Sequence, residues 1–496
     1  MFIRRKRLRD VMKTLNVMGF DLGASSGRGI LGSFDGDKLT LREIHRFPHN
    51  FTIMNGHAFW NVLSLYDAMK ESLRLCPEKL DGMGFDTWGV DCGVLDAQGN
   101  LLGLPMSYRD AALDDDNMRQ VLDELGAEYL CEQTGIANLA YNTLYKLSYL
   151  KREMPAQLES ADRILFMPNL FEYLFSGVAH AEYSIASTSQ LFNMREKRWA
   201  CEIMDKLGFH RDWFPEVDYS GKILGKVRAD VGEQTGQPQA AVISVAGHDT
   251  ACAVAAVPSA EEEFTFLSCG TWSLLGVSAR QMMDTQAVLR DQISNEGTCD
   301  GGYRPTVNII GMWIFQELRR NFQKQGKDYS FPQMTELARK AAPLRSFIRP
   351  DDFMQPGDYT VKIRAYCEQT GQHVPEDDGE LARCVLESLA MKYRQVYESL
   401  RPYITWDEKL YVVGGGVQND LLMECAANAL GIPVILGASE ATAVGNIMEQ
   451  LRALGAYHTR DEKCQILDRS FCTTEVRPMQ TEAWEQAYQR FEALYQ

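Results

Sequence analysis

The sequence predicts an α/β protein built from two related halves, each with a mixed sheet flanked by helices. The first 91 residues indicate three antiparallel strands, a helix and a further strand, the order expected for such a sheet. A second hydroxyl-rich turn follows an apolar strand near residue 270 and repeats the pattern of a turn near residue 25. The 496 residues are enough for two large domains or about three of average size. These observations place the boundary between the halves near residue 245.

Residues 17–47 are predicted to form an antiparallel meander of three strands. The first strand is a short apolar run that ends in Asp21, and a turn of small residues connects it to the second strand. An Asp35-Gly36 turn between two strand-like runs is typical of a hairpin. A helix follows, and one of its faces is formed by Leu63, Tyr66, Met69 and Leu73. Residues 83–91 are expected to form the next strand and its exit loop.

The second half begins with a helix of small residues that opens at Gly247-His248-Asp249-Thr250. A strand over 264–267 and a hydroxyl-rich turn over 268–273 follow it. Farther on, apolar residues spaced by three and four predict a long helix that ends before Pro402. Its apolar face consists of Leu386, Leu389, Tyr393, Val396 and Leu400. The remaining predicted elements are a strand over 410–413, a glycine turn over 414–416, a helix over 419–430, a strand over 432–436 and a helix over 443–454.

Composition and charge narrow the possible functions. Hydrophobic residues make up 45% of the chain, which is ordinary for a folded globular protein. The net charge of −16 argues against nucleic acids or anionic membranes as partners, because these require a basic surface. No run of about 18 apolar residues is present, so no membrane span is predicted. The twelve cysteines are scattered without C-x-x-C spacing, which indicates reduced thiols and a cytoplasmic protein.

The first 16 residues form a basic leader that starts with Met1-Phe2-Ile3-Arg4-Arg5. No apolar segment follows it, so a secretory signal is not predicted. We expect a disordered extension here, and an interaction tail is the alternative.

The predicted oligomeric state is a monomer or a homodimer.

The turn after Asp21 is suited to binding phosphate groups. Small residues over 22–27 leave backbone N–H groups accessible, and Arg28 adds a charged donor. Asp21 itself, at a strand end, is suited to holding Mg²⁺ through water. A plain hairpin turn with an exposed serine pair explains the same residues equally well. Gly270-Thr271 is a weaker candidate for a second phosphate turn.

Two further segments are suited to nucleotide chemistry, although P-loop and Rossmann motifs are absent. Gly414-Gly415-Gly416 lies between a strand and a helix, where bare backbone would accept a flat ligand such as adenine. Asp249 stands in the first turn of a helix, and the helix N-terminus favours its ionised form. In a cleft, such a carboxylate accepts a proton from a hydroxyl that attacks phosphorus. A helix N-cap is the other explanation for Asp249.

These segments, in this order, resemble the FGGY carbohydrate kinases of the actin-like superfamily, in particular the members that phosphorylate L-rhamnulose. The resemblance runs from about residue 17 to about residue 475. Its most specific stretches are DLGASSGR at 21–28, DTWGVD at 86–91 and HDT at 248–250. Further matching stretches lie at 41–47, 108–110, 142–145, 268–274, 295–297, 308–313 and 413–419.

The resemblance implies an α/β fold of two actin-like (ribonuclease H-like) domains, with the active site in the cleft between them. Each domain is expected to contain a mixed five-stranded sheet flanked by helices. The N-terminal domain, 17–244, would bind sugar and phosphate, and the C-terminal domain, 245–475, would bind ATP and carry the base. A C-terminal helix is expected over 476–496.

The resemblance also implies a reaction, the phosphorylation of L-rhamnulose by ATP in L-rhamnose catabolism. It assigns the general base to Asp249 and Mg²⁺ to Asp21. The implied ATP contacts are Ala24, Ser25, Ser26, Gly27, Arg28, Thr271, Gln316 and Gly415. The implied ketose contacts are Gly89, His248, Asp249, Thr250 and Asn308. Trp88 and Asp91 are expected to shape the sugar pocket.

Two alternatives remain open at this point. The residues at 92–94 and 246–247, beside the expected sugar pocket, depart from the family pattern. An FGGY kinase for another ketose or polyol, such as L-fuculose, xylulose, ribulose or a quorum-signal sugar, is therefore the nearest alternative. An actin-like ATPase without a sugar substrate is the second.

Overall fold

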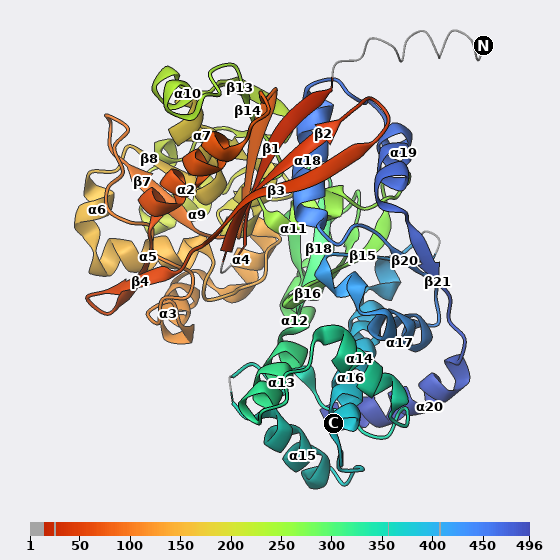
Figure 1. The fold of residues 1–496 in the computed structure, drawn as a ribbon. Coiled ribbons are helices and arrows are strands. Elements are labelled where there is room, and N and C mark those ends of the chain that lie inside the picture. Colours follow the sequence, from red (N-terminus) through yellow and green to blue (C-terminus); the bar gives the residue numbers. More distant parts are fainter. Residues whose placement is uncertain (1–13, 24–25, 356, 406–407) are drawn as a thin grey trace. The chain divides into compact units, whose positions relative to one another are not determined.

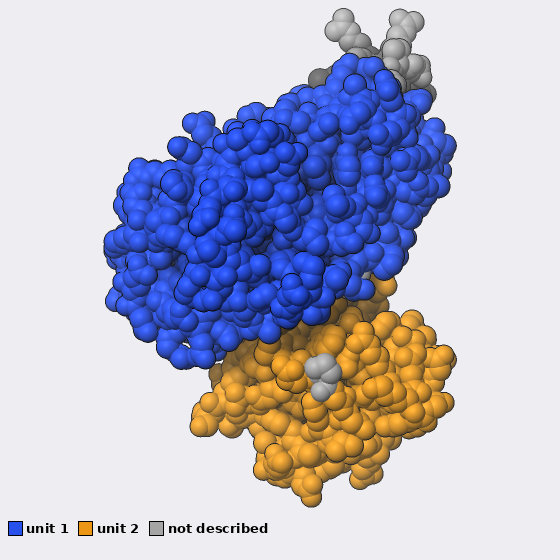
Figure 2. Space-filling model, turned by 90° about the vertical axis from the view of Figure 1, so that its left-hand side faces the viewer, with its two compact units in different colours: residues 1–260, 279–305, 441–472 blue, residues 261–278, 306–440, 473–496 orange. Residues whose placement is uncertain are grey.

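A computed structural model describes residues 14–23, 26–355, 357–405 and 408–496. Most of the predicted leader, residues 1–13, lies outside the described residues. The chain divides into two compact units, which Figure 2 shows in different colours. Unit 1 contains residues 1–260, 279–305 and 441–472, and unit 2 contains residues 261–278, 306–440 and 473–496. Each unit thus combines segments that are distant in the sequence. The domain limits expected from the sequence stay a prediction.

Unit 1 is built on a six-stranded mixed sheet with the strand order β13-β14-β6-β1-β2-β3. Its strands are β1 (Leu15–Leu22), β2 (Ser26–Phe34), β3 (Leu39–Pro48), β6 (Gly82–Thr87), β13 (Lys222–Lys226) and β14 (Ala241–Ser244). The first three strands pair antiparallel in sequence order, which confirms the predicted meander. Strand β6 then pairs parallel with β1, and β14 pairs parallel with β6.

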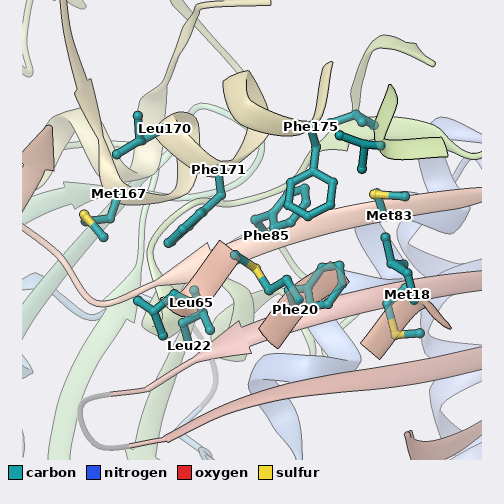
Figure 3. Close-up of a cluster of buried hydrophobic side chains, with 14 of the residues drawn as sticks. Met18, Phe20, Leu22, Leu65, Met83, Phe85, Met167, Leu170, Phe171 and Phe175 are labelled. Atoms are coloured by element: carbon teal, nitrogen blue, oxygen red, sulfur yellow. The ribbon is translucent and has the colours of Figure 1, made fainter. Parts of the chain in front are cut away.

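One face of this sheet is covered by α2 (Val62–Leu75) and α7 (Met167–Ser176). Because side chains alternate along a strand, every second residue of β1 and β6 points to this face. Phe20 and Phe85 stack there with ring centroids 5.0 Å apart, and both contact Phe175 of α7. Figure 3 shows these rings pointing toward one another between the strands and the helix. This layer is the main core of unit 1.

The predicted apolar face of α2 is wrong at one position. Leu63 lies in the first turn of α2 and is 61% exposed, whereas the neighbouring Val62 and Leu65 are buried. Met69 and Leu73 are buried as predicted. The buried stripe is thus rotated by about one residue, because the sheet, and not the spacing alone, selects the face that packs.

The other face of the sheet packs against α18 (Ala441–Ala453), which comes from near the end of the chain (Figure 1). Glycines on the strands let this helix approach closely. A Cβ atom at Gly32 would lie 2.6 Å from Cγ2 of Ile447 on α18. Gly445 allows the same helix to approach α11 (Asp249–Ala255), because a Cβ atom there would lie 1.8 Å from the carbonyl oxygen of Cys252. The start of α11 is therefore held tightly beside the sheet.

The remaining elements of unit 1 are short strands and helices outside this sheet, and β17 among them belongs to the second sheet. The strands are β4 (Phe51–Met54), β5 (His57–Trp60), β7 (Cys92–Leu95), β8 (Arg163–Phe166), β9 (Ala181–Glu182), β10 (Phe192–Asn193), β11 (Arg198–Trp199), β12 (Val217–Asp218) and β17 (Ser294–Gly297). The helices are α3 (Asp115–Leu125), α4 (Ala127–Thr134), α5 (Thr143–Glu153), α6 (Pro155–Glu159), α8 (Tyr183–Ala186), α9 (Cys201–Leu207), α10 (Ala229–Thr235), α12 (Thr285–Asp291) and α19 (Arg460–Phe471).

The second sheet has seven strands in the order β17-β18-β16-β15-β19-β20-β21. Its further strands are β15 (Phe264–Cys269), β16 (Trp272–Ser278), β18 (Tyr303–Ile310), β19 (Leu410–Val413), β20 (Val434–Leu436) and β21 (Thr474–Val476). Strands β15, β16 and β18 form an antiparallel meander, and β19 pairs parallel with β15. This repeats the arrangement of β1, β2, β3 and β6, which supports the predicted internal repeat. The sheets have six and seven strands, more than the five expected.

The helices of unit 2 include α16 (Asp378–Leu400), which packs against β16 and four other helices of this unit. It ends before Pro402, as predicted from its apolar spacing. The other helices are α13 (Trp313–Lys324), α14 (Phe331–Lys340), α15 (Tyr359–Gln369), α17 (Asp420–Leu430) and α20 (Thr481–Glu492). Within the described parts of the chain, no helix has the length and apolar character needed to cross a membrane.

Candidate active site

A pair of carboxylates lies at the ends of two neighbouring strands of unit 1. Asp21 near the end of β1 stands opposite Asp86 near the end of β6 in the parallel register. Both side chains are buried, Asp86 completely. Asp21 forms an ion pair with Arg28, which lies opposite it on β2. The turn between these two residues is the predicted phosphate turn, and its Ala24 and Ser25 lie outside the described residues.

Asp86 is held in an environment that favours its protonated form. Burial raises the pKa of its carboxyl well above the usual range, and the charges of Asp21 and Asp249 act in the same direction. The amide of Asn446, on α18, opposes this effect by donating to Oδ2 of Asp86 at 2.7 Å. The other carboxyl oxygen, Oδ1, has no hydrogen-bond partner among the described residues. A buried carboxyl oxygen left in this way is suited to a ligand that brings positive charge.

Asp249 is the first residue of α11, and His248 is its N-cap. An isolated parallel bridge joins His248 to Thr87 at the end of β6, so the strand carrying Asp86 positions this helix start. The Asp249 side chain is 31% exposed, and its Oδ1 accepts a hydrogen bond from the Thr250 hydroxyl at 3.1 Å. A partly accessible carboxylate at a helix N-terminus can take up a proton from a bound hydroxyl.

The His248 ring lies among charged groups. Nδ1 lies 2.8 Å from Nη2 of Arg304 and 3.1 Å from Oε2 of Glu296, and Nε2 lies 3.4 Å from Oδ1 of Asp249. Arg304 is completely buried and pairs with Glu296. Burial alone would raise the pKa of Glu296, but Arg304 and His248 hold it below its usual range. This cluster orients the imidazole ring beside the candidate base.

A buried carboxylate, Glu182, supports the backbone before this helix. Its Oε2 accepts hydrogen bonds from the backbone N–H of Gly247 at 2.9 Å and from that of Ile185 at 3.1 Å. The Ser184 hydroxyl donates to the same oxygen. Burial raises the pKa of Glu182 from 4.5 to about 6. Gly247, where the sequence departs from the family pattern, is thus anchored through its backbone N–H to a carboxyl oxygen that also accepts two hydrogen bonds from α8.

The exit loop of β6 carries Trp88, Gly89 and Asp91. Trp88 is 5% exposed, and Gly89 is half-buried beside the side chain of Thr188. Asp91 is completely buried and accepts a hydrogen bond from the Trp88 indole at 2.8 Å. The Trp88 indole and the Asp91 carboxylate therefore face the interior, and the half-buried Gly89 leaves part of the loop backbone accessible.

In unit 2, a pocket of about 730 Å³ brings together Thr271, Gln316 and Gly415. The Gln316 amide donates to the Thr271 hydroxyl at 3.4 Å. Glycines 415 and 416 form one wall, and Phe331, Pro332 and Asn419 belong to the rest of the lining. A pocket of this size with apolar and polar walls is suited to a nucleotide-sized ligand.

The structure groups the predicted site residues in two sets. Asp21, Gly27, Arg28, Gly89, His248, Asp249 and Thr250 belong to unit 1 together with Ser26. Thr271, Gln316 and Gly415 belong to unit 2 and share its pocket. Asn308, predicted to contact the ketose, is an exposed residue of β18 in unit 2, unlike the other four ketose contacts.

Sequence reasoning assigned no role to Asp86, Glu182, Glu296, Arg304 or Asn446. One available signal was that both β1 and β6 carry an acid near the strand end, since parallel neighbours bring such residues to one edge of a sheet. Asn446 has no comparable local signal, because its partner Asp86 lies 360 residues away in the chain, and the contact of Arg304 with His248 spans 56 residues.

Comparison with known protein families accounts for nearly all of the chain. Residues 16–256 match the N-terminal domain of the FGGY family of carbohydrate kinases, and residues 265–454 match its C-terminal domain. The chain belongs to the FGGY family of carbohydrate kinases. The resemblance found in the sequence is thereby confirmed, and the protein is a sugar kinase.

Relatives of this FGGY kinase include a rhamnulokinase from Bacteroides thetaiotaomicron. It is 40% identical over 482 residues, which cover 96% of this chain and 98% of that protein. A xylulose kinase from Rhodospirillum rubrum has a TM-score of 0.80 at 18% identity, covering 97% of this chain and 98% of the other. A gluconate kinase from Lactobacillus acidophilus has a TM-score of 0.79 at 14% identity, with the same coverage. At these identities the two structures show the fold alone, and they confirm the expected two-domain α/β fold.

Proposed function

We propose that this FGGY kinase transfers a phosphoryl group from ATP to L-rhamnulose, giving L-rhamnulose 1-phosphate and ADP in L-rhamnose catabolism. The observation that carries the proposal is the 40% identity to a rhamnulokinase over 98% of that protein. The local arrangement supports it, because a partly exposed carboxylate stands at the start of α11 beside the end of β6 and a strand-end acid pair.

Asp249 acts as the general base in this proposal. Its carboxylate accepts the proton of the 1-hydroxyl of the ketose as that oxygen attacks the γ-phosphorus and the bond from phosphorus to the β-phosphate oxygen breaks. Gly89, His248 and Thr250 hold the sugar in unit 1, and Asn308 of unit 2 is a further contact. The Arg304 and Glu296 contacts of His248 support this role, because a ring fixed in orientation loses little freedom when it binds.

The nucleotide is proposed to bind through two sets of residues. Thr271, Gln316 and Gly415 contact ATP in the pocket of unit 2, which is supported by their shared place in its lining. Residues Ala24, Ser25, Ser26, Gly27 and Arg28 contact the phosphates as the first phosphate turn. The proposed transfer requires the γ-phosphate of this nucleotide to reach the 1-hydroxyl of the sugar.

Asp21 and Asp86 fit a Mg²⁺ ion. No group of three or more histidine, cysteine or acidic residues suited to a metal occurs among the described residues. Mg²⁺ does not require such a group, since it is usually held by one or two carboxylates together with substrate phosphates and water. The carboxyl oxygen of Asp86 that has no partner in the described structure supplies the buried acceptor. Bound Mg²⁺ would offset the negative charge of the phosphate oxygens during transfer.

The same proposal includes a cytoplasmic location, a monomeric or homodimeric state, and the domain roles expected from the sequence. The location is supported by the cysteines, most of which are buried as free thiols.

A panel of sugars tests the proposed substrate. The rate of ADP release is measured with L-rhamnulose, L-fuculose, D-xylulose, L-ribulose and glycerol, and without sugar. We expect kcat/KM for L-rhamnulose to exceed that for every other sugar by at least about tenfold, since hydroxyl contacts discriminate strongly. A higher value for another sugar would reassign the substrate within the family. ADP release that is independent of every sugar would contradict the proposal altogether.

A further inference from the structure

A buried ion pair lies behind the exit loop of β6. Lys146, in the first turns of α5, pairs with Asp91 of the loop, and their side chains are 1% and 0% exposed. Removing two charges from water is costly, and apolar residues of similar size often stabilise a fold as well as a buried pair does. Stability of the fold alone therefore does not explain the Lys146–Asp91 pair, and the groups that the pair holds in place do.

Asp91 holds two indole rings. Its Oδ2 accepts hydrogen bonds from Nε1 of Trp60 at 2.5 Å and from Nε1 of Trp88 at 2.8 Å, while Lys146 takes Oδ1. The backbone N–H of Tyr108 donates to Oδ2 at 3.2 Å. The two indoles are in contact, with ring centroids 4.3 Å apart. One carboxylate thus fixes the side chain of Trp88, the residue before Gly89.

The same lysine also holds the loop backbone. Val90 has a φ of 65°, a left-handed conformation that is unfavourable for a β-branched residue. Its carbonyl oxygen accepts from Nζ of Lys146 at 3.3 Å and from the hydroxyl of Thr143 at 2.8 Å. Its N–H donates to the hydroxyl of Thr188 at 3.0 Å. These contacts secure a backbone conformation that the residue would not adopt by itself.

We propose that Lys146 is a positioning residue for the sugar, and this inference rests on the proposed ketose contact of Gly89. Lys146 does not touch the substrate. It joins the Asp91 carboxylate, which orients Trp88, to the Val90 carbonyl, which sets the backbone that follows Gly89. The lysine consequently determines where the loop presents its N–H and carbonyl groups to the sugar hydroxyls. Its loss should weaken sugar binding selectively and leave nucleotide binding in unit 2 intact.

The test compares Lys146→Met with the wild type, using whichever sugar of the panel the wild type phosphorylates best. A failure of L-rhamnulose as the substrate therefore leaves this test intact. We expect KM for the sugar to rise at least about tenfold and KM for ATP to stay within about twofold, since the lost contacts position the sugar alone. If the methionine variant does not fold, Lys146→Gln is used, whose shorter amide retains one hydrogen bond and should give a smaller rise in KM for the sugar.

Asn117→Leu is the matched control, because the Asn117 amide donates to the carbonyl of Tyr145 on α5 at 3.2 Å without contacting the loop. This variant should lower the Tm and leave both KM values within about twofold, since it loosens the same helix without releasing the loop. Adding Val90→Gly to Lys146→Met should recover part of the sugar affinity, because glycine adopts a positive φ without strain. An unchanged KM for the sugar in the folded Lys146 variant, or an equal rise in the Asn117 variant, would overturn the proposal.

Discussion

Asp21 and Asp86 stand directly opposite each other on the parallel strands β1 and β6, on the sheet face that α18 covers. Arg28 forms an ion pair with Asp21, whereas Asp86 receives a hydrogen bond from the neutral amide of Asn446. Burial, followed by the nearby charge of Asp21, raises the pKa of Asp86. In the described contacts, Asp21 is thus paired with a cation and Asp86 is not. The environment of Asp86 is therefore suited to a positively charged ligand.

The first prediction concerns the response to Mg²⁺. Asp86→Asn keeps the shape of the side chain and can still contact Asn446, but it lacks the charge that a metal ion requires. We expect the half-saturating concentration of free Mg²⁺ to rise at least about tenfold, with KM for the sugar little changed. Because the pKa of Asp86 is raised, the wild type should also need more Mg²⁺ as the pH falls, since a protonated carboxyl is a poor ligand. Kinase rates titrated with Mg²⁺ at several pH values measure both effects, and a titration unaltered by the substitution would assign Asp86 a purely structural role.

The second prediction concerns the proposed base. Asp249→Asn should reduce kcat by at least about 10²-fold, the usual scale for loss of a general base. Folding and ATP affinity should be unaffected, since the side chain is partly exposed and Asp249 is not among the residues that line the pocket of unit 2. Steady-state rates, circular dichroism and calorimetric titration with ATP provide the three measurements. Asp123→Asn, at an exposed position of α3, is the matched control and should behave like the wild type. A near-normal kcat in the Asp249 variant would rule out this residue as the base.

The third prediction is a pH dependence of stability that originates at Glu182. Folding raises the pKa of this carboxyl from 4.5 to about 6, so the folded protein binds the proton more tightly than the unfolded chain does. The resulting stabilisation is fully present below the unfolded pKa and is lost as the pH rises through the folded pKa. Its size is about 2 kcal/mol. The free energy of unfolding of the wild type, relative to Glu182→Gln, should therefore fall by about this amount between about pH 4 and about pH 7.5.

Urea unfolding of both proteins at several pH values measures this difference. The glutamine side chain at 182 is uncharged at every pH. The other titrating groups contribute equally to both curves, so their contributions cancel in the difference. A difference that stays constant across the range would show that Glu182 has the same pKa in the folded and unfolded states.

Local sequence patterns predicted the meander of β1, β2 and β3, the strands β6, β15, β19 and β20, and the helices α2, α11, α16, α17 and α18, but no element between residues 92 and 245. The Asp35-Gly36 turn, the apolar spacing from Leu386 to Leu400 and the stop before Pro402 each depend on residues close together in the chain. The error at Leu63 arose because helix periodicity defines a stripe but not its rotation toward the sheet. The strands β13, β17 and β21 at the sheet edges were not predicted.

The site was less predictable than the fold. The candidate base and the glycine turn are recognisable as motifs, but the contacts of Asp86 and Val90 are not. Asn446 reaches Asp86 from 360 residues away, and Lys146 reaches Val90 from 56 residues away. Such contacts follow from strand register and from helix packing through glycines, neither of which a local pattern encodes.

The last prediction separates the two adjacent glycines of the ATP pocket. A Cβ atom at Gly416 would lie 2.1 Å from Sγ of Cys269, whereas one at Gly415 would have no neighbour within 4 Å. Gly416→Ala should therefore cost about 1–3 kcal/mol of stability, the usual range for overpacking, and should also raise KM for ATP by displacing the turn. Gly415→Ala should leave the free energy of unfolding within about 0.5 kcal/mol of the wild type, because its surroundings are open.

The kinetic effect of Gly415→Ala decides whether the exposed backbone of this turn touches the nucleotide. If ATP lies against it, the added methyl group occupies space needed by the ligand, and KM for ATP should rise by about tenfold with KM for the sugar unchanged. Thermal unfolding and steady-state kinetics on both variants supply the comparison. An alanine at 415 that changes neither stability nor KM for ATP would remove Gly415 from the nucleotide site, while the response at Gly416 would still report the packing of the turn against Cys269.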